Sequence, residues 1–165
     1  MNMVKKKISK APLIALVLLV LSSIMAYAIV NLIETDMSKY VIADVIKVSD
    51  STVIIGNNCT AIVAETSQER ADSIESGIEG VVNERPTTHD TFVAVLKSFN
   101  ITLDSVNIER YDGKYYYADL ILRSKDKILK LDTRPSDAVA LAVRTNSTVY
   151  INKTMLQEVG INICE

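Results

Sequence analysis

The sequence has a single histidine, His89, and only two cysteines, Cys59 and Cys164. A structural zinc site takes about four Cys or His ligands at short spacings, so one histidine without a Cys-x-x-Cys pair excludes the usual kinds. No glycine-rich phosphate loop or dinucleotide-binding fingerprint occurs among the five glycines. The sequence therefore gives no indication of a zinc finger, a P-loop nucleotidase or a dinucleotide-binding domain.

Basic residues are scarce outside the N-terminal segment. Residues 34–165 hold 14 basic and 20 acidic side chains, a formal charge of −6. A protein that binds nucleic acid through its phosphates is usually basic. A nucleic-acid role for this chain therefore requires a local basic patch or a bridging metal ion.

The N-terminal segment has the pattern of a membrane anchor. Four lysines among the first ten residues precede an uncharged apolar run, Ala11–Ile33, of 23 residues. About 20 apolar residues cross a bilayer as a helix, and lysines stay on the cytoplasmic side. We expect a cytoplasmic tail over 1–10, a single transmembrane helix over 11–33, a linker over 34–39, and one domain, 40–165, outside the cell.

Three features leave alternatives open. Ala26-Tyr27-Ala28 has the small-x-small form of a signal-peptidase site, so cleavage after Ala28 is the rival to an uncleaved anchor. Outside the cell the two cysteines could form a disulfide, and the alternative is two free thiols. Asn-x-Ser/Thr occurs four times, a mild excess that agrees with export in an organism that glycosylates; the asparagines are Asn58, Asn100, Asn146 and Asn152.

The domain shows three strands and a helix, twice over, with a further helix between the two sets. Period-2 and period-3.6 patterns and turn residues give the boundaries. Strands are expected over Tyr40–Val48, Thr52–Ile55, Cys59–Ala64, Ile101–Arg110, Tyr115–Arg123, Lys127–Thr133 and Thr148–Ile151. Helices are expected over Ser67–Gly80, Thr88–Phe99, from Pro135 to Arg144, and Thr154–Val159. Strands grouped ahead of helices predict an α+β fold with antiparallel or mixed sheets.

The stretch Asp132–Arg144, DTRPSDAVALAVR, combines a charged start with an apolar helix. Pro135 suits the first turn of a helix, and Asp137 faces the positive end of its dipole. The residues that follow are apolar on every face, which predicts a buried helix. Charges at the start of a buried helix must be paired, bind an ion or line a cleft.

A second polar stretch, Arg85–Asp90 (RPTTHD), also precedes a helix. Carboxylates can hold Mg²⁺ or Mn²⁺, arginine binds phosphate, and histidine moves a proton near neutral pH. These residue types suit metal-assisted hydrolysis of phosphodiesters. The alternative is that these residues have structural roles only: Thr88, Asp90 and Ser136 cap helices, Asp137 pairs with Arg134, and His89 is a structural hydrogen-bonding residue.

The two stretches RPTTHD and RPSDAVALAVR, in this order, resemble the signatures of the bifunctional nuclease domain family. The resemblance runs from about Tyr40 to about Gly160, and it implies an α+β fold and nuclease activity on RNA and DNA. The chain departs from the family pattern in two places. One is the membrane segment, and the other is the helix Gln68–Gly80, which carries Arg70, Asp72 and Glu75 where the family is more apolar. These departures affect, respectively, the expected substrate and any site shared between the two halves.

We therefore expect a membrane-anchored nuclease of low sequence specificity, with RNA or DNA as substrate and an oligomer left open. The catalytic candidates are His89, Asp90, Asp132 and Asp137. The candidates for substrate binding are Arg85, Arg134 and Ser136, and Asp132 and Asp137 are the expected ligands for Mg²⁺ or Mn²⁺. The alternative is a non-enzymatic interaction domain at the cell surface, on the same fold.

Overall fold

The computed structural model describes residues 15–23, 25, 37–81 and 84–164. The chain divides into two compact units, Met1–Met37 and Ser38–Glu165. In the first, residues 15–23 are helical. Within the described residues, no helix has the length and apolar character needed to cross a membrane. Most of the expected span Ala11–Ile33, including the cleavage point at Ala28, lies outside the described residues.

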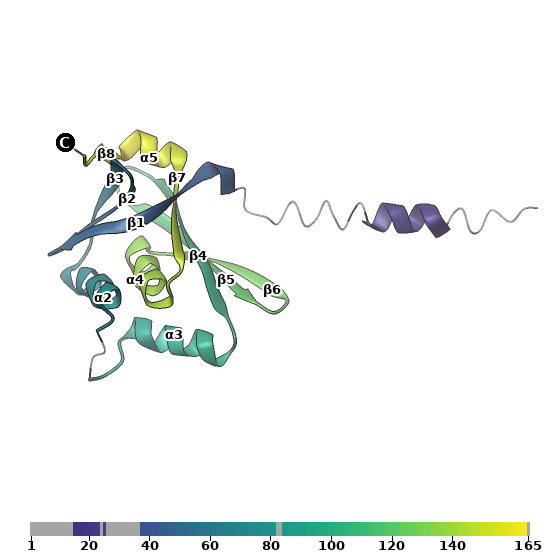
Figure 1. Cartoon of the computed structure of the whole chain (residues 1–165), viewed down its shortest axis with the longest axis horizontal. Helices are drawn as coiled ribbons and strands as arrows, with labels where there is room; N and C mark the ends of the chain where they lie inside the picture. The colour runs from purple at the N-terminus through teal and green to yellow at the C-terminus, as the bar shows by residue number, and fades with distance from the viewer. Residues whose placement is uncertain (1–14, 24, 26–36, 82–83, 165) are drawn as a thin grey trace, which may run out of the picture. The chain divides into compact units, whose positions relative to one another are not determined.

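The second unit is built on one eight-stranded sheet with the order β6-β5-β4-β7-β1-β2-β3-β8 (Figure 1). The strands are β1 Tyr40–Ser49, β2 Thr52–Asn57, β3 Thr60–Glu65, β4 Thr102–Tyr111, β5 Tyr116–Ser124, β6 Lys127–Thr133, β7 Thr148–Asn152 and β8 Ile161–Asn162. Strand β7 pairs parallel with β4, and every other neighbouring pair is antiparallel. The two expected three-strand sets are thus two meanders, joined through β7, and the predicted α+β fold with a mixed sheet is confirmed.

The helices of this unit follow the strands as the sequence indicates. They are the short 3₁₀ helix η1 Met37–Lys39 and the α-helices α2 Gln68–Glu79, α3 Thr88–Ser98, α4 Pro135–Thr145 and α5 Lys153–Val159. Helix α4 packs against α2, α3 and the strands β4, β5 and β7 (Figure 1). Its residues Ala138 to Ala142 are all buried, each with at most 4% of its surface exposed, which confirms the buried helix.

In the β5–β6 part of the sheet, strand alternation divides the side chains between the face that α4 covers and the opposite face, which we call the outer face. Ala118 and Leu120 of β5 are buried in the core that α4 also joins. Asp119 lies between them in the strand, so its side chain projects to the outer face. Leu131 of β6 pairs with Leu120, and Asp132 pairs with Asp119. The side chain of Asp132 therefore belongs to the outer face, away from α4.

Four strands begin two residues after a residue with positive φ. Asp50, Asn58, Asn100 and Asn146 have φ between 50° and 54°, and the threonines that open β2, β3, β4 and β7 follow each at the second position. Asparagine and aspartate tolerate this left-handed conformation, and β-branched threonine suits a strand. Asn152 is the N-cap of α5. All four Asn-x-Ser/Thr sites therefore have a conformational role that is independent of glycosylation.

Cys59 and Cys164 form a disulfide across a Cα–Cα distance of 5.0 Å. Cys59 lies in the turn between β2 and β3, and Cys164 follows β8, which pairs with β3. The bond closes a sequence separation of 105 residues and fixes the C-terminal segment to the first meander. Of the two alternatives for the cysteines, the structure has the disulfide.

Candidate polar site at the starts of two helices

The first turns of α3 and α4 lie together and bring their polar residues into one cluster. Helix α3 begins with a capping box, in which the Asp90 backbone N–H donates to Thr87 Oγ1 at 3.2 Å and the Thr87 N–H donates to Asp90 Oδ2 at 2.8 Å. Helix α4 begins at the N-cap Arg134, with Pro135 in the first turn. These two starts place His89 and Asp137 opposite each other.

His89 lies between a carboxylate and a hydroxyl group. Its Nε2 is 3.5 Å from Asp137 Oδ1, and its Nδ1 is 2.9 Å from Ser73 Oγ of α2. The side chains of His89 and Asp137 are 17% and 20% exposed, so solvent reaches the edge of the pair. The other carboxylate oxygen of Asp137 accepts a hydrogen bond from Arg134 Nε at 2.7 Å, and the Arg134 side chain is 64% exposed.

The partners of His89 define its tautomer. A carboxylate only accepts hydrogen bonds, so we assign the proton to Nε2, which lies 3.5 Å from Asp137 Oδ1. In the neutral ring Nδ1 is then the acceptor, and the Ser73 hydroxyl donates to it. The order hydroxyl, imidazole, carboxylate is the arrangement by which a base activates a hydroxyl group or a water molecule.

The environment keeps His89 neutral near pH 7. Burial lowers the pKa of the imidazole, and the Arg144 guanidinium lowers it further, whereas the Asp137 and Asp90 carboxylates raise it. Burial is the largest of these causes, and the net direction is below the ordinary value of 6.5. A neutral imidazole can accept a proton, as a general base must.

Asp90 and Arg144 form the second part of the cluster. Arg144 Nε donates to Asp90 Oδ1 at 2.8 Å, and Nη1 donates to the carbonyl oxygens of Ser73 at 2.7 Å and Ala140 at 2.9 Å. The arginine side chain is 8% exposed. Hydrogen bonds from Thr87 and then Arg144 lower the pKa of Asp90 to about 2. Arg144 thus ties α4 to α2 and α3 behind His89.

The close approach of α2 to α4 depends on Gly77. A Cβ at this position would lie 2.5 Å from Val143 Cγ2 and 2.7 Å from Arg144 Nη1. Any residue with a Cβ here would force the Val143 and Arg144 side chains to shift, so glycine leaves room for the guanidinium to reach the Ser73 carbonyl. The glycine that weakens α2 as an isolated helix therefore allows the cluster to form.

The structure brings together some of the predicted site residues and separates others. His89, Asp137 and Arg134 are in contact, and Asp90 joins them through Arg144. Asp132 is exposed on the outer face of β6. Arg85 is exposed in the segment before α3, outside the contacts of the cluster described above.

The expected helix caps require two corrections. Ser136 is not the cap of α4, because Arg134 holds that position and no side chain makes a cap hydrogen bond there. Thr88 is the first residue of α3, and Thr87 caps it with Asp90. Two of the expected structural roles are present: Asp90 takes part in capping its helix, and Asp137 pairs with Arg134.

The cluster does not fit the expected metal site. Asp132 projects from β6 to the outer face of the sheet, whereas Asp137 lies on α4, which covers the opposite face. His89 and Arg134 already engage the two oxygens of Asp137. Within the described part of the chain, no three His, Cys, Asp or Glu side chains are grouped to hold a metal ion. Divalent-metal dependence stays a prediction from the sequence, and we derive no chemical step from it.

Sequence reasoning missed Ser73 and Arg144. Arg144 is the last residue of the stretch RPSDAVALAVR, so a signal for it was present. Ser73 lies in the part of the domain where the resemblance is loosest, 16 residues before His89. Only the tertiary structure, which brings α2 to the start of α3, reveals its contact with the imidazole.

Comparison with known proteins identifies the family of the domain that holds this cluster. The family model described as "Bifunctional nuclease domain" matches residues 56–164, which include the whole polar cluster. Two Mycobacterium tuberculosis proteins, uncharacterized proteins MT1877 of strain CDC 1551 / Oshkosh and Rv1829 of strain ATCC 25618 / H37Rv, are each 33% identical over 96 residues. The match covers 58% of this chain and 57% of each relative, so the chain spans a little over half of their length. With two thirds of its residues matched by the family model, the chain belongs to the bifunctional nuclease domain family.

Proposed function

We propose that this protein is a nuclease that hydrolyses phosphodiester bonds of RNA or DNA with low sequence specificity. The observation that carries the proposal is the partly exposed His89–Asp137 pair beside the exposed Arg134, in a domain of this family. The acidic net charge of the domain is compatible with this role only because an exposed cation, Arg134, lies at the site itself.

The chemistry assigned to each residue follows from its contacts. Arg134 binds the phosphate at the start of α4, where the helix dipole also favours an anion. The attacking water gives its proton to Ser73 Oγ as the Ser73 hydroxyl passes its own proton to His89 Nδ1 and the new O–P bond forms, and Asp137 stabilises the resulting imidazolium. The old P–O bond breaks, and solvent protonates the departing oxygen. Ser73 holds the imidazole in the required tautomer before substrate arrives.

The activity test uses the compact unit Ser38–Glu165, which contains the whole sheet and its core. Purified protein is incubated with labelled single-stranded RNA and DNA, with Mg²⁺, with Mn²⁺ and with EDTA. We expect cleavage by the wild type and a loss of at least a hundredfold in His89→Gln and Asp137→Ala. Cleavage no faster than in a folded Asp137→Ala control would refute the proposal and favour the interaction-domain alternative. The EDTA arm tests the predicted metal dependence separately.

We also propose that the protein is anchored by residues 11–33, with its N-terminus in the cytoplasm and its domain outside the cell. The lysine-flanked apolar run supports this orientation, and disulfides persist in oxidising compartments. Protease added to intact cells should degrade the domain, and the chain should stay in the membrane fraction after a carbonate wash. Release into the medium would indicate cleavage after Ala28, and protection from protease would place the domain in the cytoplasm.

A further inference from the structure

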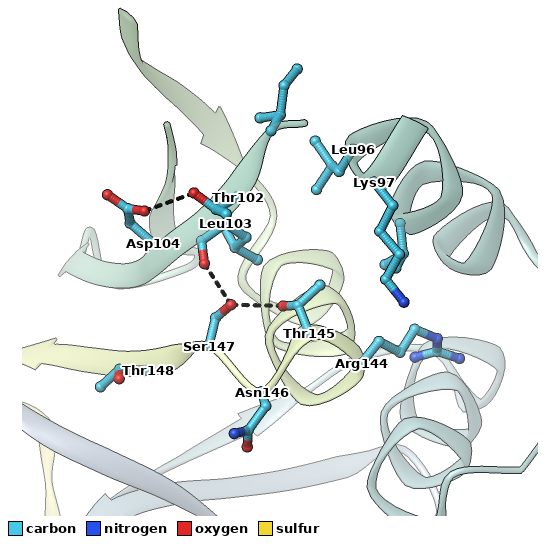
Figure 2. Close-up of a pocket in the computed structure, with 12 residues that line it drawn as sticks. Leu96, Lys97, Thr102, Leu103, Asp104, Arg144, Thr145, Asn146, Ser147 and Thr148 are labelled. Carbon is cyan, nitrogen blue, oxygen red and sulfur yellow. Dashed lines mark hydrogen bonds between the residues drawn. The ribbon is translucent and has the colours of Figure 1, made fainter. Parts of the chain in front are cut away.

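A hollow of about 560 Å³ lies where the last turn of α3, the end of α4 and the starts of β4 and β7 meet (Figure 2). Part of its lining is apolar and includes Leu96 and Leu103. Hydroxyl and amide groups complete it, among them those of Asn146 and Thr148 after α4. An apolar wall with a few polar groups is the usual composition of a site for a small ligand.

One cation, Lys97, faces this hollow without a carboxylate from the described part of the chain to balance it, whereas the second, Arg144, is paired with Asp90. Lys97 and Arg144 both line it, and Figure 2 shows the Lys97 side chain extending toward Arg144. Asp104 is the only carboxylate in the lining, and it forms an ion pair with Arg123. Lys97 makes no ion pair among the described residues. In a domain with a formal charge of −6, this hollow is a local site for an anion.

We propose that the hollow binds one nucleoside monophosphate unit of the nucleic-acid strand, which rests on the proposed nuclease function. Lys97 binds the phosphate, and the base lies against the apolar wall near Leu96 and Leu103. Arg144 connects the hollow to the polar cluster, because the same guanidinium that lines it donates to Asp90.

The spacing along α4 places this nucleotide a few positions from the bond that is cleaved. Asp137 and Arg144 are seven residues apart, or roughly 10 Å at 1.5 Å per residue. A stacked strand advances about 3.4 Å per nucleotide, so the distance corresponds to about three nucleotides. A substrate shorter than this reaches the catalytic cluster without filling the hollow.

Lys97 also has a structural role that the test must separate from binding. It is the basic residue in the last turn of α3, where a cation offsets the helix dipole. That role predicts a change in stability when the charge is removed, with no change in affinity for a nucleotide.

The binding test uses the ¹⁵N-labelled full-length protein in detergent, titrated with adenosine 5′-monophosphate and, separately, with inorganic phosphate. We expect the amide resonances of residues 145–148 to shift on titration with the mononucleotide. The affinity obtained from these shifts should be at least tenfold higher for the mononucleotide than for phosphate. Lys97→Gln should weaken mononucleotide binding about tenfold, the loss of one charge-assisted hydrogen bond. Lys125→Gln, the same change in the exposed β5–β6 turn, should leave the affinity unchanged.

Each contrary result overturns the assignment. The absence of shifts, or an equal affinity of the wild type and Lys97→Gln, would refute the proposed site. An equal affinity for phosphate and for the mononucleotide would refute the contact between the base and the apolar wall. In the nuclease assay, Lys97→Gln should raise KM for a ten-nucleotide strand several-fold, with kcat and the cleavage of a dinucleotide unchanged. Mononucleotide binding does not require cleavage, so a failure of the proposed function and a failure of this site are distinguishable.

Discussion

Replacing Arg144 with methionine should destabilise the domain more than any change of an exposed arginine. Methionine keeps most of the aliphatic stem and removes the guanidinium, which bonds Asp90 Oδ1 at 2.8 Å and the Ser73 carbonyl at 2.7 Å. Hydrogen bonds to a charged group contribute about 1.5–3 kcal/mol each. Asp90 is 34% exposed and regains water, which reduces its share, so we expect a loss of about 3 kcal/mol.

The loss should appear as a lower melting temperature. For a unit of this size, about 3 kcal/mol corresponds to a decrease in Tm of roughly 11 °C, measured by circular dichroism. Arg123→Met is the matched control, because the Arg123–Asp104 pair is exposed, with side chains 54% and 27% accessible. Exposed pairs contribute about 0–1 kcal/mol, so the control should lose at most a few degrees.

The pH dependence gives a second check on Arg144→Met. The pKa of Asp90 is lowered from 3.8 to about 2, so its ionised form stabilises the fold above about pH 4, and this contribution is lost as the pH falls toward 2. The difference between wild type and Arg144→Met should therefore be full at pH 7 and smaller at pH 2. Equal losses in the two arginine variants, or a difference that grows in acid, would refute the buried-pair reasoning.

Three further predictions concern the same domain. Gly77→Ala should lower the free energy of unfolding by about 1–3 kcal/mol in urea titrations, although alanine favours a helix, because its Cβ meets Arg144 and overpacks the α2–α4 contact; an unchanged stability would contradict this. The activity should fall in acid through an apparent pKa below 6.5, that of His89, and Asp137→Asn should move this pKa further down because the carboxylate raises it; an upward shift would exclude His89 as the base. Reduction of the disulfide should cost about 4.7 kcal/mol of stability, as expected for a closed loop of 105 residues, and an unchanged Tm in dithiothreitol would contradict the bond.

The sequence by itself determined the elements and the fold class. The alternation of apolar residues, the turn signal Asp112-Gly113 and the helix start at Pro135 predicted the order of strands and helices, because these are local properties of the chain. The alternation of apolar residues in the β4 sequence slips between Leu103 and Val106, which indicates a bulge, and the β4–β5 register is irregular between Leu103 and Ser105. The apolar character of the helix after Asp137 predicted its burial, since no face of it could meet water. The family resemblance rested on residues that the domain match now includes.

Tertiary structure decided which polar residues meet. Asp132 and Asp137 are five positions apart, yet the two-residue alternation of β6 directs Asp132 to the outer face, and this direction depends on which face α4 covers. Ser73 of α2 meets His89 of α3 across 16 positions of sequence, and Gly77 leaves room for Arg144 of α4 to reach the Ser73 carbonyl. The asparagines that looked like glycosylation sites hold left-handed turns and one helix cap. Contacts between distant segments depend on how elements pack, and no local pattern in the sequence carries that information.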